Sequence, residues 1–554
     1  MNLLIQSYII LNSWYIQGEA MIENRKIVSS HIFIFPFKWD YGVGSSIEER
    51  TNVDKFVELL GCEWKKQNRD IIEDSEYNKY TYFYDNVRQA IYGRNNYHDY
   101  IESFNVYKKV RDYCFKKKNN KAIVQCLKYN GLFSDSKYVI SLDDDSKYIL
   151  NLKDIKLKIY DTGVANLIYF LENCNENSTK DDILKINDFG RRIYPQYLPI
   201  PNCQKSFLAK ELSLQLSPNK RPIEEYFDYD YKKYPTRISK TIMDILGNNF
   251  ECIKEKINSK KIFITPVIDD RMFVMCRYDN TLVSQSLQKY TKFNSIKDDF
   301  WYKYIFVDNG SATCQDNNMF ENLLKESTYM RWKNYGTFYG ISRYSFVLLK
   351  NENSPDYLNN HFHTIYFEMV LLALTQRASI LRFSDEASKI AILNENETLK
   401  RVKSLQKLYI EFINNIYFRE VTAQEQGIEM YDKLLEMMRI ERDVKRLDEE
   451  INEIHKYTSQ ISAGYTNNLL HLITYFTTSI TICGLVRELY IKHIDNQNGL
   501  TDGILGRLTI WPIIITIVIT FGISTAIKKG KLKILMGIII IFFIIAGIRI
   551  FFVP

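Results

Sequence analysis

The C-terminal part of this 554-residue chain constrains its fold more than any other feature. From residue 461 the sequence becomes strongly apolar and stays so, with short breaks, to Pro554. Residues 508–527 are uncharged, residues 534–553 carry one charge, and both runs are long enough to cross a bilayer as helices. A third run, 465–486, also lacks Lys, Arg, Asp and Glu but is dotted with Asn, His, Ser and Thr. The sequence therefore predicts a transmembrane region at 461–554, with three spans at about 465–486, 508–527 and 534–553.

Charges near the ends of these runs predict their orientation. Four lysines and no acidic residue lie between the second and third runs, whereas basic and acidic residues are balanced between the first and second. Because basic loops stay on the cytoplasmic side, the large N-terminal part is expected in the cytoplasm of a multi-pass protein of the inner or plasma membrane. Nine cysteines without a CxxC pair agree with a reducing compartment. The net charge of +7 is mild for this length and predicts no direct nucleic-acid partner.

Residues 1–350 alternate between short β-like runs and helical patches, which predicts an α/β or α+β domain. Helical patterns fall at 53–60 and 180–189. Runs rich in β-branched and aromatic residues predict strands at 31–37, 147–152, 155–160, 261–267, 272–278 and 304–307. We interpret this part as a ligand-sensing domain that ends at the turn-rich segment 351–360.

After that segment, residues 351–460 have the periodicity of long helices and are interpreted as a helical stalk. Within 424–460, apolar residues recur at alternating spacings of 3 and 4, which is the pattern of a coiled-coil seam. A helix packed inside its own domain would have the same pattern. No proline lies between Glu429 and the first apolar run, so the stalk could continue into the first span as one rod.

A polar stripe marks the first predicted span. Its residues are separated by 4, 3, 4 and 3 positions and share one helix face: Asn467, His471, Thr474, Thr478 and Thr481. Burying amides and an imidazole against lipid is unfavourable, so this face should meet protein or water and could line a pore. The alternative is that the threonine hydroxyls bond to carbonyl groups of their own helix. One polar face cannot enclose a channel, so a pore requires a homo-oligomer.

The predicted architecture resembles that of the CorA-like membrane proteins. In both, a cytoplasmic α/β domain is followed by a long helix that enters a first span, and then by a short outer loop. The Gly-Met-Asn that ends the first span of CorA magnesium transporters is absent, because Gly484 is followed by Leu485 and Val486. Several segments more closely resemble the divergent CorA-like proteins of bacterial phage defence, a group that includes type III CRISPR-associated members. These segments are TGVANLIYFLEN (162–173), DILKINDFGRRIYPQYL (182–198), DDRMFVMCRY (269–278), YMRWKNYGTFYGISRYSFVLL (329–349), FEMVLLALTQRASILRFSDEAS (367–388) and FREVTAQEQGIEMYDKL (418–434).

This resemblance implies a function and an assembly. In that group the cytoplasmic domain is thought to bind a nucleotide second messenger, in at least some members a conjugate of S-adenosylmethionine with AMP. The membrane part then opens or disrupts the membrane of the infected cell. CorA-like architecture also implies a pentamer.

Three pieces of sequence are candidates for ligand binding. Arg191 and Arg192 follow a glycine, and paired guanidiniums can clamp a phosphate, although a solvated basic turn has the same sequence. Asp269 and Asp270 lie between two predicted strands, where a carboxylate could hold a ribose hydroxyl or an amino group, or simply shape a turn. Arg331 and Arg343 flank two glycines that permit close backbone approach, with core packing as the alternative.

No Walker loop, nucleophile elbow or HExxH motif is present in the sequence. We therefore expect no catalytic residues, no bound metal and no cofactor other than a nucleotide activator. The leading hypothesis is a ligand-gated, homo-oligomeric membrane channel of antiviral defence. The first alternative is a CorA-like divalent cation transporter, with Mg²⁺ as the transported ion, against which the missing Gly-Met-Asn counts. The second is an enzyme tethered to the membrane.

Overall fold

A computed structural model describes residues 26–42, 47–67, 79, 81–93, 123–193, 208–227, 238–252, 260–268, 270–289, 293, 298–390 and 395–494. The chain divides into two compact units, Met1–Ile461 and Ser462–Pro554. The segment 351–360 is therefore not a boundary between compact units, because the helices that follow it belong to the first unit together with the strands that precede it.

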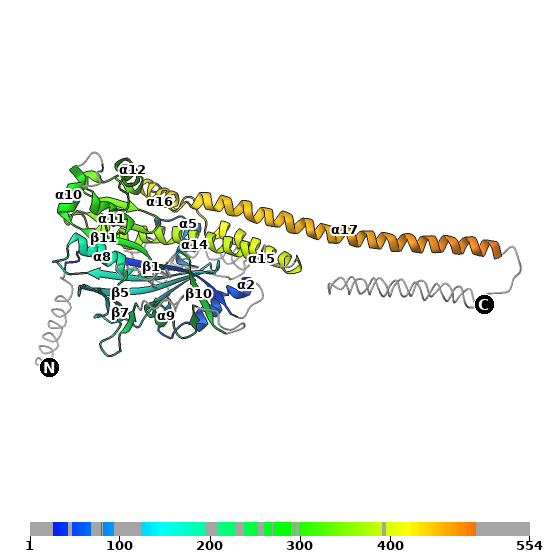
Figure 1. Ribbon diagram of the computed structural model, residues 1–554, viewed down its shortest axis with the longest axis horizontal. Coiled ribbons are helices and arrows are strands. Elements are labelled where there is room, and N and C mark those ends of the chain that lie inside the picture. Colours follow the sequence, from blue (N-terminus) through cyan, green and yellow to red (C-terminus); the bar gives the residue numbers. More distant parts are fainter. Residues whose placement is uncertain are drawn as a thin grey trace, which may run out of the picture. The chain divides into compact units, whose positions relative to one another are not determined.

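Within the described residues, the strands of the first unit form one 14-stranded mixed sheet (Figure 1). The main path is β12-β13-β14-β11-β1-β6-β5-β4-β7-β8, while β10 pairs with β1 and β9, and β3 pairs with β2 and β5. Two pairs are parallel, β11 with β14 and β9 with β10. The strands are β1 Ser29–Tyr41, β2 Trp64–Lys66, β3 Val124–Tyr129, β4 Lys137–Ser141, β5 Lys147–Tyr160, β6 Val164–Asn173, β7 Glu211–Gln215, β8 Ile223–Tyr226, β9 Phe250–Glu251, β10 Ile262–Pro266, β11 Phe273–Asp279, β12 Thr328–Tyr329, β13 Phe338–Ile341 and β14 Ser345–Lys350.

Helices cover both faces of this sheet. The helices of one hydrophobic cluster are α3 Val53–Leu59, α8 Lys180–Gly190, α9 Lys240–Leu246, α10 Thr281–Lys289, α11 Asp299–Phe306 and α12 Asn317–Ser327. The helices of the other are α2 Ile47–Arg50, α5 Asp85–Tyr92, the π-helix η4 Phe362–Tyr366, α14 Phe367–Ile390, α15 Glu395–Asn415, α16 Glu425–Met438 and the start of α17 Ile440–Ile494. Two short helices, the 3-10 helix η3 Lys333–Tyr335 and α13 Tyr357–His361, lie in connections.

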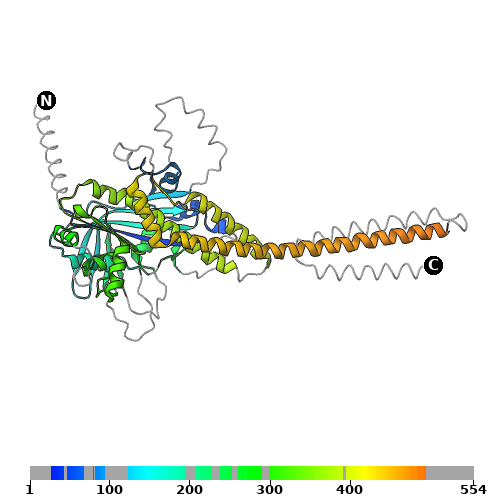
Figure 2. The same ribbon diagram turned by 90° about the horizontal axis from the view of Figure 1, so that it is seen from above.

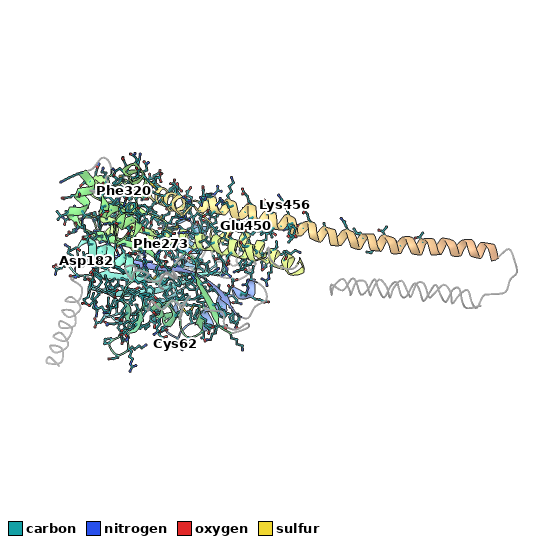
Figure 3. All side chains as sticks on the ribbon, viewed as in Figure 1. Cys62, Asp182, Phe273, Phe320, Glu450 and Lys456 are labelled. Carbon is teal, nitrogen blue, oxygen red and sulfur yellow. The ribbon has the colours of Figure 1, made fainter. Side chains whose placement is uncertain are left out.

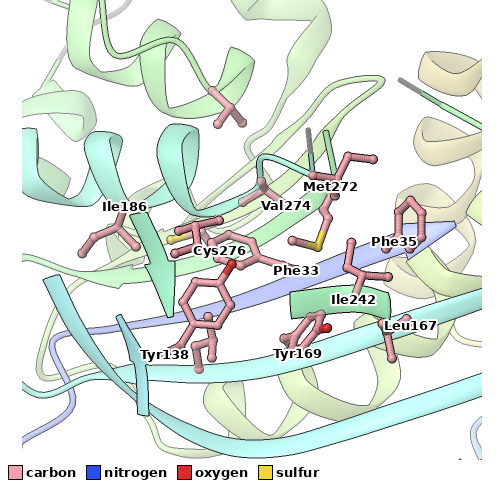
Figure 4. Packing of buried hydrophobic residues seen from close by; sticks show 14 of the residues in the cluster. Phe33, Phe35, Tyr138, Leu167, Tyr169, Ile186, Ile242, Met272, Val274 and Cys276 are labelled. Atoms are coloured by element: carbon pink, nitrogen blue, oxygen red, sulfur yellow. The ribbon is translucent and has the colours of Figure 1, made fainter. Parts of the chain in front are cut away.

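The central strand β1 shows how the sequence creates two apolar faces. Its side chains alternate, so Ile32 and Ile34 join one cluster while Phe33 and Phe35 join the other. Figure 4 shows Phe33 and Phe35 among the labelled side chains of β4, β6, β11, α8 and α9. The strand is hydrophobic on both faces because helices cover both, which explains its nearly continuous apolar run.

Most of the predicted strands are confirmed, and one is wrong. The runs at 31–37, 261–267 and 272–278 lie in β1, β10 and β11. The runs at 147–152 and 155–160 form one strand, β5, whose pairing with β6 shifts register between Leu152 and Asp154. The run at 304–307 instead lies at the end of α11, where Trp301, Tyr304 and Ile305 are buried. Their helical spacing lets one face pack on the sheet, and this tertiary packing overrides the β preference of a short aromatic run.

Helix α14 is the buried centre of the second helical layer. Its polar residues meet polar groups of the sheet at regular intervals. Glu368 pairs with Lys158 of β5 at 2.5 Å, the Thr375 hydroxyl accepts from Asn166 of β6 at 2.9 Å, and Arg382 donates to the Gly163 carbonyl at 2.8 Å. Because each polar group has a fixed partner, these contacts set the register of α14 on the sheet.

The region predicted as a stalk folds differently from a free coiled coil. Helices α14, α15 and α16 pack with the sheet in one core. At Arg439 the backbone turns left-handed, with φ at 58°, and separates α16 from α17. The apolar seam of α17 is buried in this same core through Ile451, so here the alternative interpretation, a helix packed in its own domain, is the one observed. In both views the first part of α17 runs along the helical layer (Figure 1, Figure 2).

The second unit is described only through α17, which continues without a break to Ile494, as the sequence predicted. The prediction of three spans is not met in the part of the chain that the structure describes. There, a single helical stretch, Tyr357–Ile390, is long and apolar enough to cross a membrane, and it is mostly buried in the first unit, which makes it weak evidence. Most side chains of the predicted span at 465–486, and the whole of the runs at 508–527 and 534–553, lie outside the described residues, so these three spans stay a prediction.

Candidate ligand-binding site

Arg191 and Arg192 come directly after α8, and local sequence fixes where that helix starts and stops. At its start, Thr179 and Asp182 form a reciprocal capping box. At its end, the Gly190 carbonyl accepts a hydrogen bond from the Tyr138 hydroxyl at 2.7 Å. A Cβ at Gly190 would lie 2.8 Å from the ring of Phe33, so only glycine lets the end of α8 approach β1 this closely.

The two arginines, called here the buried arginine pair, share one carboxylate. Asp188 Oδ1 accepts from Arg191 Nη2 at 3.2 Å and from Arg192 Nη2 at 3.4 Å. Its other oxygen accepts from Asn309 at 3.0 Å. Asp188 lies three and four residues before Arg191 and Arg192, which is about one helical turn, so the three side chains come together.

Asp270 provides the second carboxylate. Its Oδ2 lies 3.0 Å from Arg192 Nη1, and its Oδ1 forms an ion pair with Arg271 Nε at 3.3 Å. The backbone joins the two segments as well, because Met272 N donates to the Arg191 carbonyl at 2.7 Å and Ile193 N donates to the Asp270 carbonyl at 3.0 Å. The structure thus brings together Arg191, Arg192 and Asp270 as the sequence predicted, whereas Asp269 lies outside the described residues.

This inner network is buried, and its two arginines pair with two carboxylates. Arg191 is 2% exposed, Arg192 4% and Asp270 1%. Burial lowers the pKa of Arg191 to about 10, and the nearby Arg192 and Arg271 lower it further, against the opposing effect of Asp188. Two carboxylates face two guanidiniums, so the buried arginine pair acts first as a connection between α8 and the start of β11.

A second group of arginines lies at the tip of the β13–β14 hairpin, next to this network. Tyr344 lies in the hairpin turn, and the guanidinium carbons of Arg271 and Arg377 lie 5.5 and 5.4 Å from the centre of its ring. Arg377, on α14, also donates to the Arg343 carbonyl at 2.7 Å. We call Arg271, Arg343 and Arg377 the hairpin arginine cluster.

In the hairpin arginine cluster, like charges lie close enough to repel one another. Burial lowers the pKa of Arg377, and repulsion from Arg343 lowers it further, while Tyr344 and Asp443 of α17 act in the opposite direction. Within the described residues, Arg343 Nε is buried without a hydrogen-bond partner. Like charges this close repel one another, so an anion that enters the cluster would relieve the repulsion.

Arg331 does not belong to this site. Its Nη1 pairs with Glu429 of α16 at 2.5 Å, and both side chains are more than a third exposed. The same Glu429 accepts from the Tyr329 hydroxyl, so Arg331 takes part in a surface contact between the β12 region and α16. Of the two arginines predicted from this segment, only Arg343 lies near the others.

Sequence reasoning missed five contributors, namely Asp188, Arg271, Asn309, Tyr344 and Arg377. Asp188 had a signal, because its spacing of 3 and 4 from the two arginines places it on their side of the helix. Arg377 had a weaker signal, as a lone cation in the apolar run of α14, since such a residue needs a specific partner when it is buried. Asn309 and Tyr344 have no local signal and are recruited by the tertiary fold.

The predicted pore stripe lies on α17 beyond residue 461. Asn467, Thr474 and Thr481 are exposed, and the side chains of His471 and Thr478 lie outside the described residues. Thr474 donates to the Leu470 carbonyl and Thr481 to the Thr477 carbonyl, each at 2.8 Å. For these two threonines the structure therefore has the backbone bonds of the alternative interpretation.

Two further sets of side chains that could carry chemistry are potential metal ligands and buried cysteines. No group of three or more His, Cys, Asp or Glu residues there could hold a metal ion. Cys276 Sγ lies 3.4 Å from His31 Nδ1, but burial raises the pKa of this thiol to about 12, so it stays protonated. The same ring nitrogen of His31 lies 2.7 Å from Asn187, which ties β1 to α8.

Comparisons with family models, with curated proteins and with solved structures find no match to this chain.

Proposed function

We propose that this protein is a ligand-gated, homo-oligomeric membrane effector of antiviral defence, whose N-terminal unit binds a phosphate-bearing nucleotide messenger. The observation that carries the proposal is the gathering of five arginines in one region: Arg191 and Arg192 pair with Asp188 and Asp270, Arg271 also pairs with Asp270 and lies with Arg377 against the Tyr344 ring, and Arg377 donates to the Arg343 carbonyl. Guanidiniums are the side chains best suited to phosphate, because they donate pairs of hydrogen bonds to it. The segments that carry the resemblance to CorA-like defence proteins supply all five of them.

The position of Arg377 supports a link between this site and α17. The Ser384 hydroxyl of α14 donates to Glu450 of α17 at 3.4 Å, and Figure 3 labels Glu450 on α17. Arg377 lies seven residues, about two helical turns, before Ser384 in α14, and Asp443 lies the same distance before Glu450 in α17. Asp443 raises the pKa of Arg377, as expected of a carboxylate within electrostatic reach. A ligand anion that engages Arg377 would therefore weaken its attraction to the base of α17.

The membrane part of the proposal comes from the sequence. The spans at about 465–486, 508–527 and 534–553, the homo-oligomer and the pentameric state are proposed from hydropathy and from the resemblance. A gated pore needs a ligand that binds the open state better than the closed state. In this scheme the messenger, such as a conjugate of S-adenosylmethionine with AMP, shifts α17, and the shift changes the packing of the spans.

The test is ion and dye flux from liposomes that contain the full chain. A panel of nucleotide messengers is added on the side of the N-terminal unit, with Arg377→Gln as the variant and Arg331→Gln as the matched control. The proposal expects flux only with a messenger, lost in Arg377→Gln and kept in Arg331→Gln. Steady Mg²⁺ flux without any nucleotide would refute it in favour of a divalent cation transporter. Chemical turnover of a bound nucleotide, detected by chromatography, would refute it in favour of an enzyme.

A further inference from the structure

We propose that the ligand's phosphate groups bind to the hairpin arginine cluster, Arg271, Arg343 and Arg377, and that the ligand is an anion with at least two negative charges, of the pyrophosphate type. The inference rests on the proposed function and deepens it. It also departs from the sequence hypothesis, which assigned phosphate binding to Arg191 and Arg192.

Charge balance separates the two groups of arginines. The buried arginine pair already has Asp188 and Asp270 as counter-charges at 3.0 to 3.4 Å. An anion that bound there would have to displace two carboxylates from the protein interior. In the hairpin arginine cluster, Arg271 pairs with Asp270, which also pairs with Arg192, and the positive charges of Arg343 and Arg377 repel each other. Added negative charge is therefore favourable at the hairpin arginine cluster.

The two groups of arginines also differ in their exposure to solvent. The side chain of Arg271 is 25% exposed, and Arg343 is partly exposed at the hairpin tip. Arg191 and Arg192 are almost completely buried. A ligand can thus contact Arg271 and Arg343 from solvent, whereas the surrounding residues cover the buried arginine pair almost completely.

The hairpin is held in place before any ligand arrives. The hydroxyls of Ser342 and Ser345, which flank the turn, both donate to the Ile305 carbonyl of α11. The guanidiniums of Arg271 and Arg377 lie against the Tyr344 ring, and Arg377 donates a hydrogen bond to the Arg343 carbonyl. Preorganised donors lose little entropy on binding. Because Tyr344 already contacts two cations, its ring serves the arginines, and base stacking is not its role.

The chemical class of the ligand follows from this geometry. The three arginines come from three separate elements, the start of β11, the hairpin tip and α14; the guanidiniums of Arg271 and Arg377 lie against the Tyr344 ring, and Arg343 is the next residue in the hairpin turn. Each can donate two hydrogen bonds to adjacent oxygens of one phosphate. Two linked phosphates offer enough oxygens and charge to engage at least two of the three arginines, whereas a monovalent anion cannot. A nucleotide that contains a pyrophosphate linkage satisfies the same donors.

The test is calorimetric titration of the full chain, in detergent, with inorganic pyrophosphate, and with chloride at equal ionic strength as reference. Arg343→Gln should weaken pyrophosphate binding by about tenfold or more, because a charge-assisted pair of hydrogen bonds is lost. Arg331→Gln, also a partly exposed arginine, should leave the affinity unchanged. Equal thermal melting of the two variants checks that both fold.

Each outcome decides the inference. Unchanged affinity in Arg343→Gln, equal weakening in Arg331→Gln, or no pyrophosphate binding at millimolar concentration would overturn it. Pyrophosphate binding that depends on Arg343, in a protein that shows no messenger-dependent flux, would uphold the site and refute the proposed channel. Messenger-dependent flux that is unaffected by Arg343→Gln would uphold the proposed channel and refute the phosphate site at the hairpin arginine cluster.

Discussion

Removal of the Asp188 carboxylate tests whether the buried arginine pair has a structural role. Asp188 accepts hydrogen bonds from both arginines of the pair and from Asn309. In Asp188→Ala, Arg191 keeps its bond to the Val307 carbonyl at 2.8 Å and Arg192 keeps Asp270. One buried positive charge is then uncompensated. Breaking a buried ion pair from one side costs about 3–5 kcal/mol, and we expect a loss of this size.

The assay is thermal denaturation of the full chain in detergent, followed by circular dichroism. The entropy of unfolding is about 2.1 cal/mol/K per residue, so for the unit Met1–Ile461 a loss of 3–5 kcal/mol lowers the melting temperature by about 3–5 °C. Asp144→Ala is the matched control, because Asp144 forms an exposed pair with Lys185 at 3.3 Å. Exposed pairs contribute about 0–1 kcal/mol, so the control should melt within about 1 °C of the wild type.

A second substitution separates charge from hydrogen bonding. Asp188→Asn keeps an oxygen acceptor in place but removes the charge, so it should destabilise less than Asp188→Ala and more than Asp144→Ala. The reasoning is refuted if Asp188→Ala melts at the same temperature as Asp144→Ala. That result would mean that the two guanidiniums do not depend on this carboxylate.

Three further predictions concern other parts of the molecule. Burial lowers the pKa of His31 to about 4, so unfolding takes up a proton between pH 6.5 and 4, and stability should fall by about 3 kcal/mol as the pH drops through this window. His31→Gln should reduce the pH dependence of the denaturation midpoint, and the part that remains should come from His363, whose pKa burial lowers to about 3; an unchanged pH dependence would contradict this. Gly163→Ala should destabilise by about 2–4 kcal/mol in urea unfolding, because φ is +76° and the new methyl would lie 2.7 Å from a guanidinium carbon of α14, and wild-type stability would contradict this. If the polar stripe lines a pore, Asn467→Leu should lower liposome flux while Thr474→Val leaves it unchanged, since the Thr474 hydroxyl bonds within its own helix, and the opposite ranking would exclude this pore face.

The sequence predicts best the elements whose pattern and surroundings agree. The run at 31–37 is β-branched and aromatic, and it lies in the most central strand, buried on both faces. The run at 304–307 has the same composition, yet it is helical, because four residues are too few to show a period and the surrounding helix face decides the outcome. The seam of α17 was visible in the sequence, but its partner was not, since a heptad pattern does not say whether the covering surface comes from the same chain.

The candidate site shows the same division. Arg191, Arg192, Asp270 and Arg343 were predicted individually from short motifs, and the structure brings them into one region. Their roles depend on neighbours that are distant in sequence, such as Asn309 for the inner network and Arg377 for the outer cluster. Charge compensation and exposure are properties of the folded arrangement, so the sequence could not separate a buried clamp from an accessible anion site.

The burial of α14 has a consequence for biosynthesis. The stretch Tyr357–Ile390, which includes this helix, is apolar enough to cross a membrane, so in a partly made chain lipid would be an alternative environment for it. The strands to which its polar residues bond, β5 and β6, and the central strand β1 all precede α14 in the chain. The sheet surface that α14 packs against has therefore been synthesised when α14 itself appears, and α15, α16 and the start of α17 complete its burial later. Its buried Glu368, Arg377 and Arg382 further penalise lipid as an alternative, so the order of elements and three charges together direct this helix to the sheet.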